Sequence, residues 1–147
     1  MQIAQRSLLV MAILISLTIS ACANGSGQTT TSVNMAPASQ LPAELRSAPA
    51  SVQEAYRFAI ANQELLSQIP CFCGCGAVGH KSNLGCYITE DGQPGNVVEY
   101  DNHALGCGIC VDITQDVMTM LPEGKTVEQM RAIIIDRYGS FGPSTDP

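Results

Sequence analysis

Large aromatic side chains are scarce in this sequence. Of its 147 residues none is tryptophan, four are tyrosine and three are phenylalanine. A folded domain of about 100 residues buries only a limited fraction of its surface, and without large aromatic anchors its core is marginal. We therefore expect a bound metal or disulfides to contribute to its stability.

Basic side chains are also few. The chain has 7 lysines and arginines against 13 acidic residues, a formal net charge of −6. An acidic surface disfavours nucleic acid and anionic lipid head groups as partners, whereas it is compatible with cations. Covalent haem attachment is disfavoured too, because Val111 and not a histidine follows Cys107-x-x-Cys110.

The first 21 residues predict export. One arginine, Arg6, precedes an apolar run that ends in Ile19-Ser20-Ala21-Cys22. A basic start, an apolar centre and small residues before the cleavage point are typical of a secretory signal. The following cysteine makes the segment resemble a bacterial lipoprotein signal, in which this cysteine is acylated. A transmembrane anchor is the alternative, although residues 7–21 are short for a hydrocarbon core of ~30 Å.

These features divide the chain into four parts. We expect a lipoprotein signal peptide at 1–21, a flexible tether at 22–40, a cysteine-rich helical domain at 41–143 and a frayed tail at 144–147. The tether is small, polar and almost uncharged, so it cannot bury a core. The mature protein is then predicted to lie outside the cytoplasm, held at the cell membrane by a lipid on Cys22.

The expected fold is mainly α: a small three-helix domain with an irregular Cys/Gly-rich loop. The first helix is predicted to begin at a Ser51–Glu54 capping box and to end before Pro70. The second is predicted over 103–121, with Asp101 or Asn102 as its cap. The third is predicted to begin at Thr126, with Gln129 completing a capping box, and to end at Gly139. Residues 86–89 and 97–100 are short strand-like runs that allow a short β-hairpin.

Six cysteines fall in this domain: Cys71, Cys73, Cys75, Cys86, Cys107 and Cys110. In an exported chain they can form three disulfides, with 15 connectivities. A bridge between two of the alternate cysteines would be strained, because disulfides need a Cα separation of about 4.4–6.8 Å and a fixed torsion. Each clustered cysteine would therefore need one of the three distant cysteines as its partner. This disulfide-stapled binding module is one hypothesis for the domain.

A metal site is the leading hypothesis, and it requires the cysteine loop to curl. In an extended segment alternate sulfurs would lie about 6.6 Å apart. Thiolates that share one ion at ~2.3 Å can be at most ~4.6 Å apart. Gly74 and Gly76 supply the necessary backbone freedom, and Cys107 and Cys110 lie one helical turn apart. Because neighbouring helices in a bundle tend to run antiparallel, we expect the two cysteine clusters to meet in one site.

Thiolate ligands favour copper(I), zinc or cluster iron. We favour copper(I), with zinc as the alternative, because no base for a catalytic zinc site is evident. His80, in the cysteine loop, is the better additional ligand, and His103 is either a ligand or a residue of the helix start. The methionines Met118, Met120 and Met130 are expected in the core. A protein that donates or accepts the metal is the expected partner.

Thiol chemistry is the rival hypothesis. A Cys-x-x-Cys pair near a helix start has a lowered thiol pKa, because the helix N-terminus stabilises the thiolate. Cys107 would then attack disulfides of exported proteins and Cys110 would resolve the mixed disulfide. The protein would be a thiol–disulfide oxidoreductase.

Two family resemblances follow from these motifs. The stretch IPCFCGC, at 69–75, with GHKSNLGCYI after it, resembles the PCYCGC-motif lipoproteins, with Phe72 in place of the usual tyrosine. That resemblance implies export and says little about activity. Residues 105–142 are similar to the cytochrome c maturation thiol-reductase family in the Cys-x-x-Cys, Gly-Lys-Thr and Arg-Tyr-Gly elements. Gly106 replaces that family's arginine, so the similarity implies a helical fold more than a shared reaction.

Overall fold

A computed structural model describes residues 32–89 and 99–145 of the chain. The predicted signal peptide, Cys22 and the first part of the tether lie outside these ranges, as do the turn of the predicted hairpin and the first two residues of its second strand, at 90–98. Within the described ranges, no helix has the length and apolar character needed to cross a bilayer.

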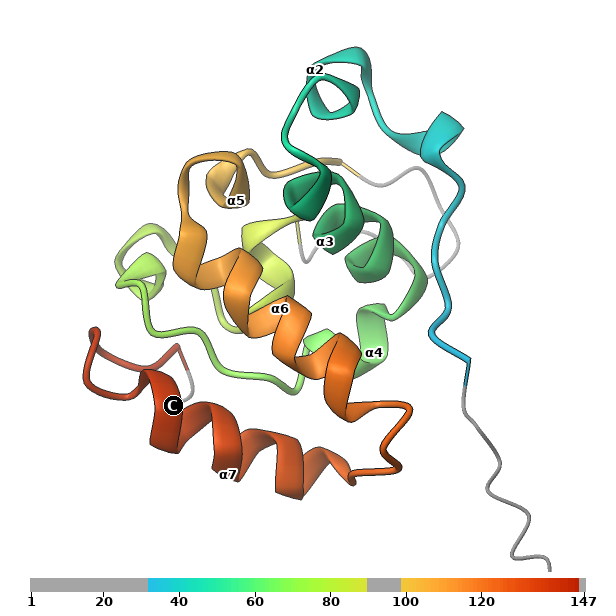
Figure 1. Ribbon diagram of the computed structural model, residues 1–147. Coiled ribbons are helices and arrows are strands. Elements are labelled where there is room, and N and C mark those ends of the chain that lie inside the picture. Colours follow the sequence, from blue (N-terminus) through green and yellow to red (C-terminus); the bar gives the residue numbers. More distant parts are fainter. Residues whose placement is uncertain (1–31, 90–98, 146–147) are drawn as a thin grey trace, which may run out of the picture.

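The described residues form a mainly helical fold, as predicted. Figure 1 shows longer helices with several short helices beside them. The α-helices are α2 (Ala43–Arg46), α3 (Ala50–Ala61), α4 (Gln63–Leu66), α5 (His103–Gly106), α6 (Gly108–Met120) and α7 (Val127–Tyr138). Three short 3-10 helices join them: η1 (Ala38–Gln40), η2 (Cys75–Val78) and η3 (Leu84–Cys86). Of the predicted hairpin, the described residues contain one isolated antiparallel bridge, between Ile88 and Tyr100.

Helix α6 is the centre of the packing. It contacts α3 on one side and α7 on another, and α5 precedes it directly (Figure 1). Its buried residues include Ile113 and Val117, which join the large buried side chains of Tyr56, Phe58 and Tyr87. The core therefore lies between α3, α6 and the segment that carries η3, and the cysteine loop closes one end of it.

The first predicted helix is interrupted and begins differently. Pro49 is the N-cap of α3, and its carbonyl accepts hydrogen bonds from the backbone N–H groups of Val52 and Gln53. Ser51 therefore lies inside the first turn, and no side-chain cap forms. The helix breaks at Asn62, which has φ −133° and ψ 43°. Its side-chain amide donates to the carbonyls of Phe58 and Asn34, so it competes with the helical backbone.

The second predicted helix is also two helices. Cys107 has an extended backbone, with φ −119° and ψ 98°, and separates α5 from α6. Gly106 and Gly108 flank it, and glycine makes helix continuation unfavourable. Of the two predicted caps, Asn102 is the N-cap of α5 but makes no side-chain cap bond; Asp101, one residue earlier, accepts the His103 N–H through Oδ1 at 2.7 Å.

The third predicted helix is confirmed in detail. The Thr126 side chain accepts from the Gln129 backbone, and the Gln129 side chain accepts from the Thr126 backbone, so the capping box is complete. The helix ends at Tyr138, one residue before Gly139.

Both ends of the described chain are held more firmly than the composition indicates. In the expected tether, Ala36 is buried and exchanges hydrogen bonds with Arg57 of α3, through both its N–H and its carbonyl. The expectation of a frayed tail at 144–147 does not hold for Thr145. Its Oγ1 accepts the Cys71 N–H at 2.9 Å, and its own N–H donates to the Cys71 carbonyl at 3.0 Å.

Candidate metal centre

The cysteine loop curls at its glycines. Gly74 and Gly79 both adopt the left-handed backbone conformation, with φ 84° and φ 100°, and they bracket η2. Glycine adopts this conformation without the penalty that a Cβ would add. The freedom expected of Gly74 and Gly76 is therefore used at Gly74 and Gly79, since Gly76 is not among the described glycines with positive φ.

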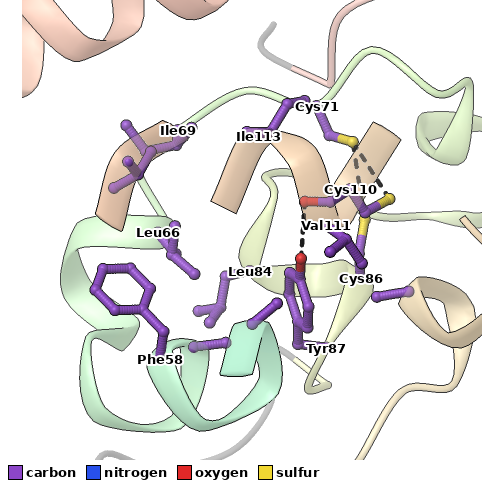
Figure 2. Packing of buried hydrophobic residues seen from close by; sticks show 14 of the residues in the cluster. Phe58, Leu66, Ile69, Cys71, Leu84, Cys86, Tyr87, Cys110, Val111 and Ile113 are labelled. Atoms are coloured by element: carbon purple, nitrogen blue, oxygen red, sulfur yellow. Dashed lines mark hydrogen bonds between the residues drawn. The ribbon is translucent and has the colours of Figure 1, made fainter. Parts of the chain in front are cut away.

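The curled loop brings its sulfurs to Cys110 at the start of α6. Cys71 Sγ lies 3.4 Å from Cys73 Sγ and 3.6 Å from Cys110 Sγ. Cys73 Sγ lies 3.5 Å from Cys110 Sγ. Cys86, from η3, approaches Cys71 at 4.0 Å and Cys75 at 3.6 Å. The two cysteine clusters thus meet in one site, as the sequence predicted, and Cys86 joins them. Figure 2 shows the sulfurs of Cys71, Cys86 and Cys110 converging beside the buried core.

The sulfur spacing suits metal ligands rather than disulfides. A disulfide holds its sulfurs at about 2.05 Å, and all six cysteines in the described part of the chain are free. Four thiolates at about 2.3 Å around a tetrahedral ion lie about 3.8 Å from one another. The four sulfurs of Cys71, Cys73, Cys86 and Cys110 lie within 4.8 Å of one another. The cysteine cluster is therefore positioned to bind a metal ion.

Both histidines lie at this cluster. His80 Nδ1 is 3.5 Å from Cys86 Sγ, and His103 Nε2 is 3.5 Å from Cys73 Sγ. The two rings pack edge to face, with centroids 5.1 Å apart. His103 belongs to two further sets of ligand atoms within 4.8 Å, one with Cys73, Cys107 and Cys110 and one with Cys73, Cys75 and Cys86. The sequence ranked His80 above His103, whereas His103 has the closer fit to a shared ion.

Asp101 contacts both histidines. The sequence did not identify it as a site residue. Its Oδ2 lies 3.4 Å from His80 Nε2, while its Oδ1 accepts the backbone N–H of His103. An N–H on His80 Nε2 directed at this carboxylate leaves the Nδ1 lone pair facing Cys86. Carboxylates that hold histidine ligands in this way fix the ring orientation and the tautomer. No motif connects residues 80 and 101, so only the fold identifies the pair.

A buried hydrogen-bond chain holds the Cys110 backbone. The amide of Asn83 donates to Thr114 Oγ1, which lies 2.7 Å from the Tyr87 hydroxyl. Tyr87 in turn donates to the Cys110 carbonyl at 2.7 Å (Figure 2). The ring of Tyr87 packs edge to face on Tyr56. These contacts fix the start of α6 relative to η3, and with it the position of the Cys110 sulfur.

Negative charge in the metal-free cluster concentrates on one sulfur. Hydrogen bonds from Cys110, and then from Cys86, hold the pKa of Cys71 far below its usual value. The same bond to Cys71 raises the pKa of Cys110, and burial raises the pKa of Cys73 and of Cys75. The pKa of Cys86 is raised as well, because its bond with Cys110, which lowers it, is outweighed by its bond to Cys71 and by burial. Among these five sulfurs, Cys71 is therefore the favoured thiolate, and the other four are favoured as thiols.

The three methionines singled out in the sequence lie in or beside the hydrophobic core. Met120 and Met130 are buried in the hydrophobic core, and Met118 packs against it. The expected core role of all three agrees with this placement.

The comparisons with known proteins bear on the family and not on the activity. The similarity of residues 105–142 to thiol reductases gains no support from them. No curated protein and no solved structure matches the chain. A family model described as "Protein of unknown function with PCYCGC motif" matches residues 11–147. Because the match includes the cysteine loop and both ends of the folded part, the chain belongs to the PCYCGC-motif family.

Proposed function

We propose that this chain is an exported, lipid-anchored protein that binds copper(I) through its cysteine cluster. The observation that carries the proposal is the convergence of four sulfurs from three segments: four of their six separations are 3.4–4.0 Å, and all lie within 4.8 Å. Thiolate ligands select soft ions such as copper(I). A metal-donor or metal-acceptor protein would be the partner.

The surroundings of the cluster favour copper(I) binding over zinc catalysis. A catalytic zinc site keeps one position open for water and places a base beside it. Asp101 is the carboxylate that reaches the histidines, and it is already engaged by His80 and by the His103 N–H. Zinc held by four thiolates in a structural role remains the alternative ion.

Elemental analysis of the full-length protein, purified without oxygen, tests the proposal. We expect bound copper, and we expect the metal-free protein to take up copper(I) in preference to zinc. The variant C71S/C110S should lose this binding, because it removes two of the converging sulfurs, whereas C22S should retain it. Recovery of the six thiols as three disulfides, with no metal retained and none restored after reduction, would refute it.

The proposed anchor is tested separately. Cys22 follows the small residues of the predicted signal, so C22S should move the protein from the membrane fraction to the soluble exported fraction. Unchanged membrane association of C22S would contradict lipid attachment at this residue.

Thiol–disulfide exchange is the second candidate. Cys107 is half-buried and is the N-cap of α6, and its sulfur lies within 4.8 Å of the Cys110 sulfur, the arrangement that an attacking and a resolving thiol need. A reductase assay on C107A/C110A discriminates between the two functions. Loss of reductase activity with metal content preserved would favour the enzyme, and loss of metal from a protein without reductase activity would favour the metal site.

A further inference from the structure

Two of the sets of converging ligand atoms in the cluster have two cysteines in common. The first comprises Cys71, Cys73, Cys86 and Cys110, and the second comprises Cys73, His103, Cys107 and Cys110. Cys73 and Cys110 belong to both, and their sulfurs lie 3.5 Å apart. Thiolate sulfur has more than one lone pair, so one sulfur can bind two ions at once.

We propose that the cluster holds two metal ions at once, bridged by Cys73 and Cys110, and that they exchange at different rates. This inference rests on the proposed function, which requires only one ion. The inner ion would lie among Cys71, Cys73, Cys86 and Cys110. The outer ion would lie on the side of His103 and Cys107.

Each ion has ligands of its own besides the shared pair. For the inner ion these are Cys71, 3.6 Å from Cys110, and Cys86, 4.0 Å from Cys71. For the outer ion they are His103, whose Nε2 is 3.5 Å from Cys73, and Cys107. The remaining set, Cys73 with Cys75, Cys86 and His103, reuses both His103 and Cys86. It is therefore an alternative placement of one ion and not a third site.

Charge does not oppose the second ion. Burying several thiolates around a single monovalent ion leaves uncompensated negative charge in a poorly solvated place, which is costly. The outer set adds only one thiolate, Cys107, because His103 is a neutral ligand and the other two sulfurs are shared. A second monovalent ion therefore leaves the net charge of the cluster unchanged, and a second divalent ion makes it less negative. The carboxylate of Asp101, beside both histidines, adds further attraction for cations.

The ligands of the two ions differ in their exposure to solvent. The two ligands that only the inner ion has, Cys71 and Cys86, are fully buried. The two ligands that only the outer ion has, His103 and Cys107, are half-buried, as is the shared Cys73. A chelator or a partner protein reaches an ion only where its ligands are accessible, so the outer ion should leave first.

The test is an anaerobic titration of the full-length, metal-free protein with copper(I), supplied as its acetonitrile complex and followed by native mass spectrometry. We expect two ions per chain at saturation. A water-soluble copper(I) chelator should then remove them in two phases, one fast and one slow, of equal amplitude. The variant H103A/C107S removes the two ligands that only the outer ion has. We expect it to hold one ion and to lose the fast phase of copper removal. C22S is the matched control and should keep two ions and both phases.

Saturation of the wild-type protein at one ion, or at more than two, would overturn the inference while leaving copper binding intact. Release of two ions in a single phase, or two ions still held by H103A/C107S, would overturn it as well. C107S alone should retain the fold, since this side chain is half-buried, and should accelerate the fast phase without changing the slow one; an unchanged fast phase would count against the outer site. Failure of the wild-type protein to take up any copper(I) would refute the proposed function itself.

Discussion

Asp101 connects the two histidines through different atoms. One carboxylate oxygen faces the ring of His80, and the other accepts the backbone N–H of His103. The Asp101 backbone is itself fixed, because its N–H donates to the Tyr87 carbonyl and its carbonyl accepts from the Tyr56 hydroxyl. The residue therefore holds the imidazole of His80 and the backbone of His103 beside the sulfurs.

The substitution D101N should weaken metal binding. It removes the charge that faces His80 while keeping an oxygen for the His103 N–H. Removing an outer partner of a metal-bound histidine typically lowers metal affinity by about 10–100-fold. Because His80 faces Cys86 but belongs to none of the sets of converging ligand atoms, we expect a loss of at most about tenfold in a competition titration against a copper(I) chelator.

The control for this substitution is D112N. Asp112 is an exposed residue of α6, so D112N removes the same charge without removing a contact to either histidine. Its affinity should stay within about twofold of wild type, because exposed charges are screened by salt. Equal losses in both variants would show that net charge, and not the position of Asp101, controls affinity.

The sequence predicted which residue types could bind the metal, but not which of the two histidines lies better placed to do so. Alternate cysteines followed by glycine indicate a curled thiolate loop in any fold. The contributions of His80 and His103 depend on Asp101, which is remote from His80 in sequence and approaches it only through the Ile88–Tyr100 bridge region. Such a contact has no local signature.

At the scale of secondary structure, the helical periodicity was predictable and the interruptions were not. Helix α7 matches its prediction because its capping box is local. The break at Asn62 arises because its side chain binds the Asn34 carbonyl, far away in the sequence. The glycines on either side of Cys107 are a local signal for a break there. That the break is a single extended residue depends on how α5 and α6 pack against each other.

The contact between the C-terminal segment and the cysteine loop can be tested at Thr145. In T145V the buried N–H of Cys71 loses its acceptor, while the shape of the side chain is retained. Leaving a buried donor unpaired costs about 1–3 kcal/mol. We expect the free energy of unfolding of the reduced, metal-free protein to fall by this amount in urea denaturation.

T119V is the matched control for the C-terminal contact. Thr119 is exposed on α6, and its hydroxyl donates to the carbonyl of Gln115 within the same helix. Surface substitutions of this kind usually change stability by less than about 0.5 kcal/mol. A T145V protein as stable as T119V would mean that the C-terminal segment does not hold the loop in solution.

For the whole molecule, convergence of the two cysteine clusters followed from general bundle geometry and was predicted. What the sequence could not supply is the support around the site. The chain from Asn83 through Thr114 and Tyr87 to the Cys110 carbonyl combines residues of two distant segments. The main chain of Cys71 depends on Thr145 in the same way. Buried polar networks of this kind depend on the complete tertiary arrangement.

The distribution of protons in the cluster makes metal affinity depend on pH. The pKa of Cys71 is lowered, whereas the pKa values of Cys73, Cys86 and Cys110 are raised, so these three sulfurs carry protons near neutral pH. A metal ion binds thiolates, so the inner ion must displace these protons. Affinity must therefore rise with pH and fall as the solution is acidified.

The expected slope is up to about three decades of copper(I) affinity per pH unit, because each displaced proton contributes about one decade. Competition titrations between about pH 7 and pH 9 stay above the range in which histidine titrates in water. They should be corrected for the protonation of the chelator. C110S removes one of the three protonated sulfurs, so its slope should be smaller by about one decade per pH unit, whereas C22S should keep the full slope. A flat profile for the wild-type protein would mean that the sulfurs are already ionised, and the assignment of one thiolate among thiols would be wrong. A slope that C110S leaves unchanged would instead place Cys110 outside the set that binds the ion.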